Sequence, residues 1–359
     1  MSFFRKNTRM TRELFQAIKS KLTGLNGAVV ACICFCAITS PIVAAEIQPV
    51  PVMFDTDMGN DIDDVFALGV LHALQSRGEC RIVAVTVSKD HPLAAPFCDV
   101  LNNFYGRSTI PIGVLRTGKS SGGGPYLAQV MKPGRDGSPA FPHRLQKSSD
   151  APLAVPVLRK GLAGLPDDSA VVIAIGPLTN IRDLLKSAPD EHSPLDGKAL
   201  VAAKVRRLVV MAGDFSKPKA EFNVFSDSEA ASSVFTQWPT ELVACPFEMG
   251  AWVHYPEMSL EKEFRVPNPH PLLAADLATF GGKRNGFMAW DLVTVLYAIR
   301  PDRDYFNMSK AGRIQLDSEG VTHLKEESEG KHRYLISRGS PDRVREALTG
   351  LASQPPSIH

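Results

Sequence analysis

Short apolar runs alternate with segments of helical periodicity along most of the chain from about residue 50 onward. The runs have the length and apolar content of buried strands, and they are VMFD (52–55), RIVAVTVS (81–88), IPIGVLR (110–116), AVVIAIG (170–176), RRLVVMAG (206–213) and TELVACP (240–246). Helical patterns separate most of them, for example DVFALGVLHAL (64–74), PLTNIRDLLKS (177–187) and DSEAASSVFTQ (227–237). This alternation predicts an α/β fold with a mostly parallel, Rossmann-like central sheet flanked by helices.

Two regions depart from this alternation. From residue 310 the pattern is typical of antiparallel strands, which predicts a small C-terminal antiparallel element, and residues 341–352 have the pattern of a closing helix. Residues 117–150 are rich in Gly, Ser, Pro and Lys. This composition predicts a long loop, which is either a lid over a site or mobile surface. Neither region indicates a second domain.

The first 45 residues have a different character. Six basic residues within the first 21 precede an apolar, uncharged stretch at 27–45, which ends in small residues around Val43 and Ala45. This order predicts a signal peptide over residues 1–45 and a secreted or periplasmic mature protein. The stretch is also about as long as a bilayer span, so an uncleaved membrane anchor is the alternative.

Composition and charge narrow the range of partners. The chain has 359 residues, of which 44% are hydrophobic and 22% charged, and its formal net charge is +2. Because basic residues form no stripe with interleaved aromatic residues, nucleic acid is not an expected partner. Cys80, Cys98 and Cys245 follow the predicted leader, and their odd number and wide spacing fit neither a disulfide framework nor a zinc site.

Five aspartates lie within FDTDMGNDIDD (54–64), directly after the first predicted strand. Ligands of open α/β sheets lie beyond the carboxyl ends of the strands, so we expect these acids at a site. A helix start accounts for Asp63 and Asp64, since carboxylates favour the positive end of the helix dipole, but not for all five. Crowded carboxylates need a cation, and oxygen ligands suit Ca²⁺ or Mg²⁺. A solvated acidic turn is the alternative.

Four motifs, in order along the chain, resemble those of the inosine-uridine nucleoside hydrolase family. They are DTDMGNDIDD (55–64), GPLTNI (176–181), VVMAG (209–213) followed by AEFNVFSDSEAA (220–231), and AWDLVTVLYAIRPD (289–302). The first motif differs from the family's usual DTDPGxDD by two extra residues before the final Asp pair and by Met58 in place of proline. The resemblance covers roughly residues 50–355 and implies a single nucleoside hydrolase-like catalytic domain over residues 46–359.

The resemblance implies Ca²⁺-dependent hydrolysis of the N-glycosidic bond of ribonucleosides, giving ribose and free base. Asp57 would contact the metal and activate the attacking water as general base. Asp64, Asp291 and the carbonyl group of Thr179 would complete the metal site, and Asp55 would orient its neighbours. The implied substrate-binding residues are Asp61, Asp63, Met211, Glu221, Asn223 and Trp290, and the two extra residues leave the division of roles among Asp61, Asp63 and Asp64 open.

Two positions depart from the family's pattern. Trp290 stands where the best-known members have a histidine that helps to protonate the departing base, and it would stack on a nucleobase or fill the wall. Ser88-Lys89-Asp90 stands where a strand-end asparagine is usual, and Lys89 would meet a substrate anion or be surface charge. These departures leave the leaving-group acid and the base preference open.

The alternative to a hydrolase is a protein of a different class, a catalytically degenerate secreted binder of ribose or nucleosides. A metal-dependent phosphatase is a weaker hypothesis than either, because the ribose-binding motif argues against it. The expected partner is a small-molecule nucleoside, without stable membrane association after the leader is cleaved. The oligomeric state, including a homo-oligomer, stays open.

Overall fold

The computed structural model describes residues 48–356, except for 119–121, 218 and 265–268. The predicted signal peptide or anchor over residues 1–45 lies outside the described residues. Within the described ranges, no helix is both long enough and apolar enough to cross a bilayer. The three cysteines in these ranges are buried free thiols.

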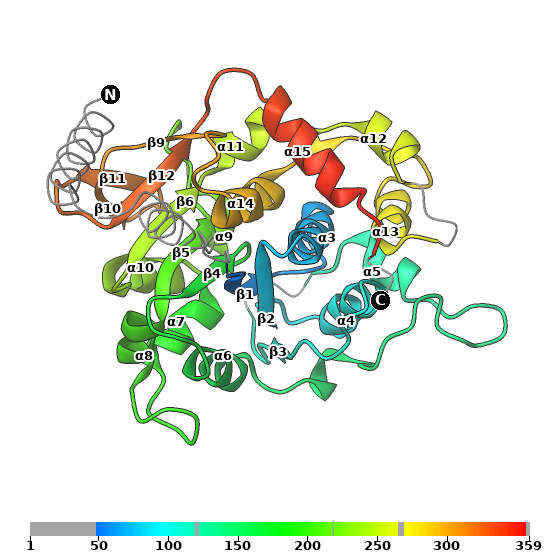
Figure 1. Cartoon of the computed structure of the whole chain (residues 1–359), viewed down its shortest axis with the longest axis horizontal. Helices are drawn as coiled ribbons and strands as arrows, with labels where there is room; N and C mark the ends of the chain where they lie inside the picture. The colour runs from blue at the N-terminus through cyan, green and yellow to red at the C-terminus, as the bar shows by residue number, and fades with distance from the viewer. Residues whose placement is uncertain (1–47, 119–121, 218, 265–268, 357–359) are drawn as a thin grey trace, which may run out of the picture. The chain divides into compact units, whose positions relative to one another are not determined.

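A mostly parallel sheet lies at the centre of the fold, as the sequence predicted (Figure 1). Its parallel strands lie side by side in the order β3-β2-β1-β4-β5-β6. They are β1 (Val50–Thr56), β2 (Cys80–Val87), β3 (Ile112–Val114), β4 (Ala170–Ala174), β5 (Val205–Met211) and β6 (Glu241–Cys245). The strand order reverses between β1 and β4. Open α/β sheets bind their ligands beyond the carboxyl ends of the strands at such a point, which places the expected site after β1 and β4.

The C-terminal part of the chain extends the sheet beyond β6, and the predicted antiparallel element is confirmed. The strands involved are β9 (Asn307–Met308), β10 (Gly312–Leu316), β11 (Thr322–Glu326) and β12 (His332–Ile336). β12 pairs in parallel with β6, whereas β9 and β10 pair with β12, and β11 with β10, in antiparallel fashion. A separate antiparallel pair joins β7 (His254–Tyr255) to β8 (Phe287–Met288).

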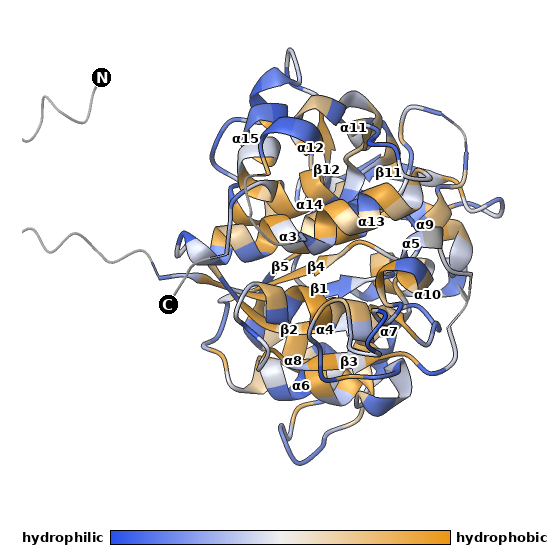
Figure 2. Ribbon diagram, turned by 90° about the vertical axis from the view of Figure 1, so that its right-hand side faces the viewer, coloured by the Kyte–Doolittle hydropathy of each residue, from blue (hydrophilic) through white to orange (hydrophobic). Residues whose placement is uncertain are grey.

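Helices cover both faces of the sheet and enclose two apolar cores. In β1, Val52 and Phe54 belong to one core and Met53 to the other, because successive side chains of a strand point to opposite faces. The first core is formed with α3 (Asp63–Ser76), α4 (Ala94–Phe104), α13 (Pro271–Thr279), α14 (Trp290–Ile299) and α15 (Asp342–Ala352). The second is formed with α6 (Ala154–Ala163), α7 (Thr179–Lys186), α8 (Gly197–Lys204) and α10 (Ser228–Gln237). Figure 2 shows the apolar residues concentrated on the central strands and the helices packed against them.

Shorter elements connect these layers. They are α5 (Pro125–Val130), the 3₁₀ helix η1 (Ser148–Asp150), α9 (Phe222–Ser226), α11 (Phe247–Trp252) and α12 (Glu257–Lys262). α5 lies within the segment 117–150, for which the composition predicted only a loop. α5 has only six residues and is surrounded by Gly, Ser and Pro residues, so its sequence has no clear helical pattern. Its Tyr126 and Leu127 are buried in the core.

Arg159 of α6 holds the connection between α7 and α8. Its guanidinium group is almost fully buried and donates to Asp190 at 2.7 and 3.0 Å, to the hydroxyl of Ser187 at 2.9 Å and to the carbonyl oxygen of Leu195 at 2.9 Å. Replacing Arg159 with methionine leaves these acceptors without their donor. We expect the free energy of unfolding to fall by about 3 kcal/mol in urea titrations. A loss below about 1 kcal/mol, the worth of an exposed ion pair, would contradict this account.

Candidate active site

Asp55 lies at the end of β1 and ties this strand to its neighbours. One carboxylate oxygen accepts hydrogen bonds from the hydroxyl of Thr86 on β2 and from the side-chain nitrogen of Asn180 on α7, the latter at 2.7 Å. Burial raises the pKa of Asp55 to about 7, although these two hydrogen bonds oppose the shift. Asp55 therefore links the end of β1 to β2 and α7 and stabilises the strand end that precedes Asp57.

A tight turn carries the chain from Asp57 into α3. Gly59 has a φ of +118°, and a Cβ atom there would lie 2.5 Å from a side-chain carbon of Leu127. Glycine is therefore needed both for the backbone conformation and for the close approach of α5. The backbone NH of Gly124 donates to the carbonyl oxygen of Gly59, and the hydroxyl of Tyr126 donates to the carbonyl oxygen of Asp61 at 3.4 Å. The start of α5 thus braces the acidic turn.

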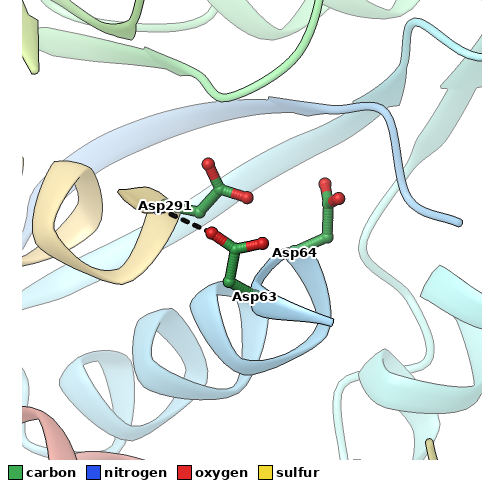
Figure 3. A group of neighbouring side chains, drawn as sticks. All are labelled: Asp63, Asp64 and Asp291. Carbon is green, nitrogen blue, oxygen red and sulfur yellow. Dashed lines mark hydrogen bonds between the residues drawn. The ribbon is translucent and has the colours of Figure 1, made fainter. Parts of the chain in front are cut away.

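Three buried aspartates meet where two helices begin (Figure 3). Asp63 and Asp64 lie in the first turn of α3, and Asp291 lies in the first turn of α14. Their carboxylate oxygens lie within 4.8 Å of one another, and the backbone NH of Asp291 donates to Asp63 at 3.2 Å. Both helix starts favour negative charge. Even so, burial first and repulsion from neighbouring aspartates second raise the pKa of all three carboxyl groups well above its usual range.

This donor set fits a hard divalent cation. Carboxylate oxygens are the ligands that Ca²⁺ and Mg²⁺ prefer, and a cation would offset the repulsion among the three acids. Asp57 lines the same cavity but is not a member of the three-residue group. Burial raises the pKa of Asp57 to about 6, whereas the ammonium group of Lys89 acts in the opposite direction. The family resemblance placed Asp63 at the sugar, and its position beside Asp64 and Asp291 makes it equally able to approach a cation.

The acids open into one cavity with residues from the connection that follows β4 and from β5, α9, α11 and α14. The residues lining it are Asp57, Asn60, Asp61, Asp63, Asp64, Ile175, Met211, Glu221, Phe222, Asn223, Phe247, Trp290 and Asp291. Nine of the predicted site residues are thus brought together, with Asp61 as the exposed acid at the edge. The sequence analysis missed Asn60, Ile175, Phe222 and Phe247. Of these four, only Asn60 and Phe222 lie inside the motifs, and that position was the one signal in the sequence that could have identified them.

Thr179 does not belong to the described lining of this cavity. It begins α7, and its hydroxyl donates to Asp227 at 2.7 Å. Asp227 in turn accepts from the backbone NH of Ala230 and caps α10. Ile175 lines the cavity from the same connection between β4 and α7. The carbonyl group of Thr179 as a metal ligand stays a prediction.

Glu221 and Asn223 form a second wall of the cavity that the acids line. Glu221 caps α9 by accepting from the backbone NH groups of Asn223 at 2.8 Å and Val224 at 3.2 Å, and burial raises its pKa to about 7. The side-chain nitrogen of Asn223 donates to the carbonyl oxygens of Ile175 at 3.2 Å and Met211 at 3.1 Å. These bonds fix the carboxamide with its nitrogen toward the protein, so that the oxygen is the atom a substrate hydroxyl can approach.

Aromatic side chains surround the mouth of the cavity. The indole NH of Trp290 donates to the carbonyl oxygen of Phe247 at 2.8 Å, and the two rings lie 5.4 Å apart at 35°. Since this NH is its only donor, Trp290 offers a ring surface and no proton. Phe222, which also lines the cavity, is 56% exposed, which is unusual for phenylalanine. Both interpretations of Trp290, stacking and wall, are compatible with this position.

Lys89 is fully buried, so it is not surface charge. It follows β2, and its ammonium group donates to the side-chain oxygen of Asn60. Burial lowers the pKa of Lys89, whereas nearby Asp57, Asp64 and Asp61 act in the opposite direction. The charged groups close to the Lys89 ammonium group are therefore the aspartates of the acidic turn.

Comparison with known proteins gives the same family as the motifs. Residues 52–343 match the family model described as inosine-uridine preferring nucleoside hydrolase. The non-specific ribonucleoside hydrolase RihC of Escherichia coli strain SE11 is 31% identical over 160 residues, which cover 42% of this chain and 49% of the relative. The match thus spans about half the length of that relative. A probable uridine nucleosidase 2 of Oryza sativa subsp. japonica is 25% identical over 75% of this chain and 79% of its own.

A solved structure described as an inosine-guanosine nucleoside hydrolase shares the fold. Its TM-score is 0.63 at 20% identity, with 84% of this chain and 98% of that chain covered. The family model covers more than half of the chain, and the acids, the wall and the strand order of the structure fall inside the matched residues. The chain therefore belongs to the inosine-uridine preferring nucleoside hydrolase family.

Proposed function

We propose that this chain is a calcium-dependent hydrolase that splits ribonucleosides into ribose and free base. The observation that carries the proposal is one cavity in which buried Asp63, Asp64 and Asp291 face Asp57 and the wall formed by Glu221 and Asn223. The family match supports N-glycosidic hydrolysis as the reaction. Calcium is the proposed metal because the described donors at this position are carboxylates, which suit Ca²⁺ and Mg²⁺, and because the resemblance of the motifs implies Ca²⁺.

Asp57 is the proposed general base. A group whose pKa is about 6 is mostly ionised at neutral pH and can accept the proton of an attacking water. A divalent cation held by Asp57, Asp64 and Asp291, with the carbonyl group of Thr179, would lower the pKa of that water. Asp61 and Asp63 complete the proposed contacts on the acidic side, to the metal or to a sugar hydroxyl.

Met211, Glu221 and Asn223 are the proposed sugar contacts. Polar atoms of Glu221 and Asn223 line the cavity close to the acids, so that they can hold a ribose while its C1 atom gains positive charge in an oxocarbenium-like transition state. The base would lie toward the aromatic mouth, where Phe222, Phe247 and Trp290 offer ring faces for stacking. Such contacts accept both purines and pyrimidines.

A secreted or periplasmic location is part of the proposal. It is supported by the basic start and the apolar stretch before Glu46. The alternative function, a secreted binder of ribose or nucleosides, would use the same wall and rings without turnover. An ionisable carboxylate at Asp57 favours hydrolysis, since a binder has no need of a base.

The test is a panel of purine and pyrimidine ribonucleosides, with p-nitrophenyl riboside, assayed with Ca²⁺ and with EDTA. We expect release of base and ribose in equal amounts only with the metal. We also expect 2′-deoxynucleosides to react at least about 10²-fold more slowly, since a site that hydrogen-bonds a hydroxyl rejects analogues lacking it. Saturable nucleoside binding in calorimetry without any release of base would support the binder instead.

A further inference from the structure

We propose that Asn60 and Lys89 form a relay that positions Asp57. This inference rests on the proposed function, because it assigns the relay to the proposed general base. Lys89 comes from the end of β2, whereas Asn60 comes from the turn between Asp57 and α3. The turn is the part of the acidic motif that is longer than the family's usual form, and Lys89 is a departure from the family's pattern. The relay connects these two departures physically.

Two hydrogen bonds make up the relay. The ammonium group of Lys89 donates to Oδ1 of Asn60, and Nδ2 of Asn60 donates to Oδ2 of Asp57. An ammonium group has only donors and a carboxylate has only acceptors, so the carboxamide of Asn60 has one compatible orientation between them. With Lys89 in place, Asn60 cannot turn its oxygen toward Asp57. The Asp57 carboxylate is therefore held by a donor of fixed direction.

Burial separates the roles of the two residues. Asn60 lines the cavity together with Asp57, whereas Lys89 is fully buried and does not belong to the described lining. A substrate that enters the cavity would meet Asn60 and not the ammonium group. Lys89 is therefore a positioning residue, which acts through Asn60 and through the attraction of its charge for Asp57.

The backbone around Asn60 is braced, so the relay has little freedom to shift. Gly59 approaches Leu127 closely, and a Cβ atom at Gly59 would lie 3.4 Å from Cε of Lys89. The turn is also fixed by the backbone bond from Gly124 to Gly59 and by the bond from the backbone NH of Met58 to the hydroxyl of Thr56 at 3.1 Å. Orientation by rigid neighbours is what a general base requires, because small displacements of a reacting group are costly in rate.

The kinetic test uses Asn60→Asp and Lys89→Met, which keep the size of each side chain and remove the donor. We expect each to lower kcat by about 10- to 100-fold, the range seen when a partner that orients an active-site ligand is lost. In Lys89→Met, KM should change by less than about threefold, because Lys89 does not belong to the described lining of the cavity. The double variant should be no slower than the slower single variant. Lys89→Arg, which keeps a charged donor, should recover part of the loss.

Lys204→Met and Asn103→Ala are matched controls outside the cavity. Lys204 donates to Leu165 and Asp167, and Asn103 donates to the carbonyl oxygen of Pro142. Both controls should keep the wild-type kcat. If Lys89 acts by charge alone, Asn60→Ala will match wild type, and that result overturns the relay. Multiplying losses in the double variant would overturn it as well.

Crystal structures of Asn60→Ala and Lys89→Met test the relay without relying on turnover. We expect the Asp57 carboxylate to leave its wild-type position in both variants while the backbone of residues 56–64 stays in place. An unmoved Asp57 overturns the relay even if the enzyme hydrolyses nucleosides. A displaced Asp57 in a protein that releases no base supports the relay and contradicts the proposed function instead.

Discussion

Asp57→Asn is expected to lower kcat for ribonucleosides by about 10²- to 10⁴-fold, the usual worth of a general base. Asparagine has the shape of aspartate and cannot accept the proton of the attacking water. The assay is release of free base at saturating Ca²⁺ near neutral pH. In wild type, kcat should also decrease at acidic pH, because the protonated form of Asp57 is not a base. Burial raises the pKa of this carboxyl to about 6 in the metal-free protein, and a bound cation would lower it.

Asp99→Asn is the matched control for this prediction. Asp99 is also a fully buried aspartate, but it lies on α4 and pairs with Arg144 at 2.8 Å outside the cavity. The control should lose stability and keep its kcat. An Asp57→Asn enzyme as active as wild type would exclude Asp57 as the base and would leave the metal-bound water to another acceptor.

Without metal, the protein is expected to lose stability as the pH rises from about 6 to about 8, through the raised pKa of about 7 of its buried acids. The pKa is raised to about 7 for Asp55, to about 6 for Asp57 and to about 7 for Glu221. The pKa of Asp63, Asp64 and Asp291 is also raised well above its usual range. A raised carboxyl pKa means that the folded state holds protons more tightly, so this stability is present at low pH and is lost as the pH rises through the folded pKa.

Other titrating groups do not reverse this trend. The pKa of His72 and His270 is lowered to about 3 by burial, and these groups affect stability only below their unfolded pKa of about 6.5. Lys89, whose pKa is lowered, acts in the opposite direction, but it is one group against six acids. Calcium should reverse the slope, because it binds the ionised carboxylates.

Thermal unfolding in EDTA and in Ca²⁺ across this pH range measures both effects. At 100 times its Kd, calcium should stabilise the fold by about 2.7 kcal/mol. Asp291→Asn removes one of the repelling charges, so it should raise the metal-free melting temperature near pH 8 and reduce the gain from calcium. A melting temperature in EDTA that stays flat with pH, or a gain from calcium that Asp291→Asn leaves unchanged, would contradict the cation site.

The parallel strands could be predicted because each is buried on both faces and therefore reads as a continuous apolar run, as in AVVIAIG and RRLVVMAG. α5 could not, since its one turn stands among Gly, Ser and Pro residues and is stabilised by tertiary contacts of Tyr126 and Leu127. Tertiary contacts of this kind override local propensity and cannot be predicted from the local sequence.

The acids of the site were predictable because five aspartates at a strand end have few structural explanations. The roles of Lys89 and Asn60 were not, because a lysine after a strand is usually exposed and only the packed turn buries this one. Phe222 and Phe247 carry no chemical signature in the sequence. Their place at the cavity depends on how α9 and α11 meet beyond β5 and β6.

Gly250 provides the space that the indole ring of Trp290 occupies. A Cβ atom at Gly250 would lie 1.9 Å from Cδ1 of Trp290, so the indole fits only where α11 carries glycine. Positions 250 and 290 should therefore covary among relatives, with larger residues at the first only where the second is smaller than tryptophan. Replacing Trp290 with histidine would leave empty space against Gly250. The residue at position 290 and the residue at position 250 are thus coupled by packing, and a variant that enlarges position 250 needs a smaller ring at position 290.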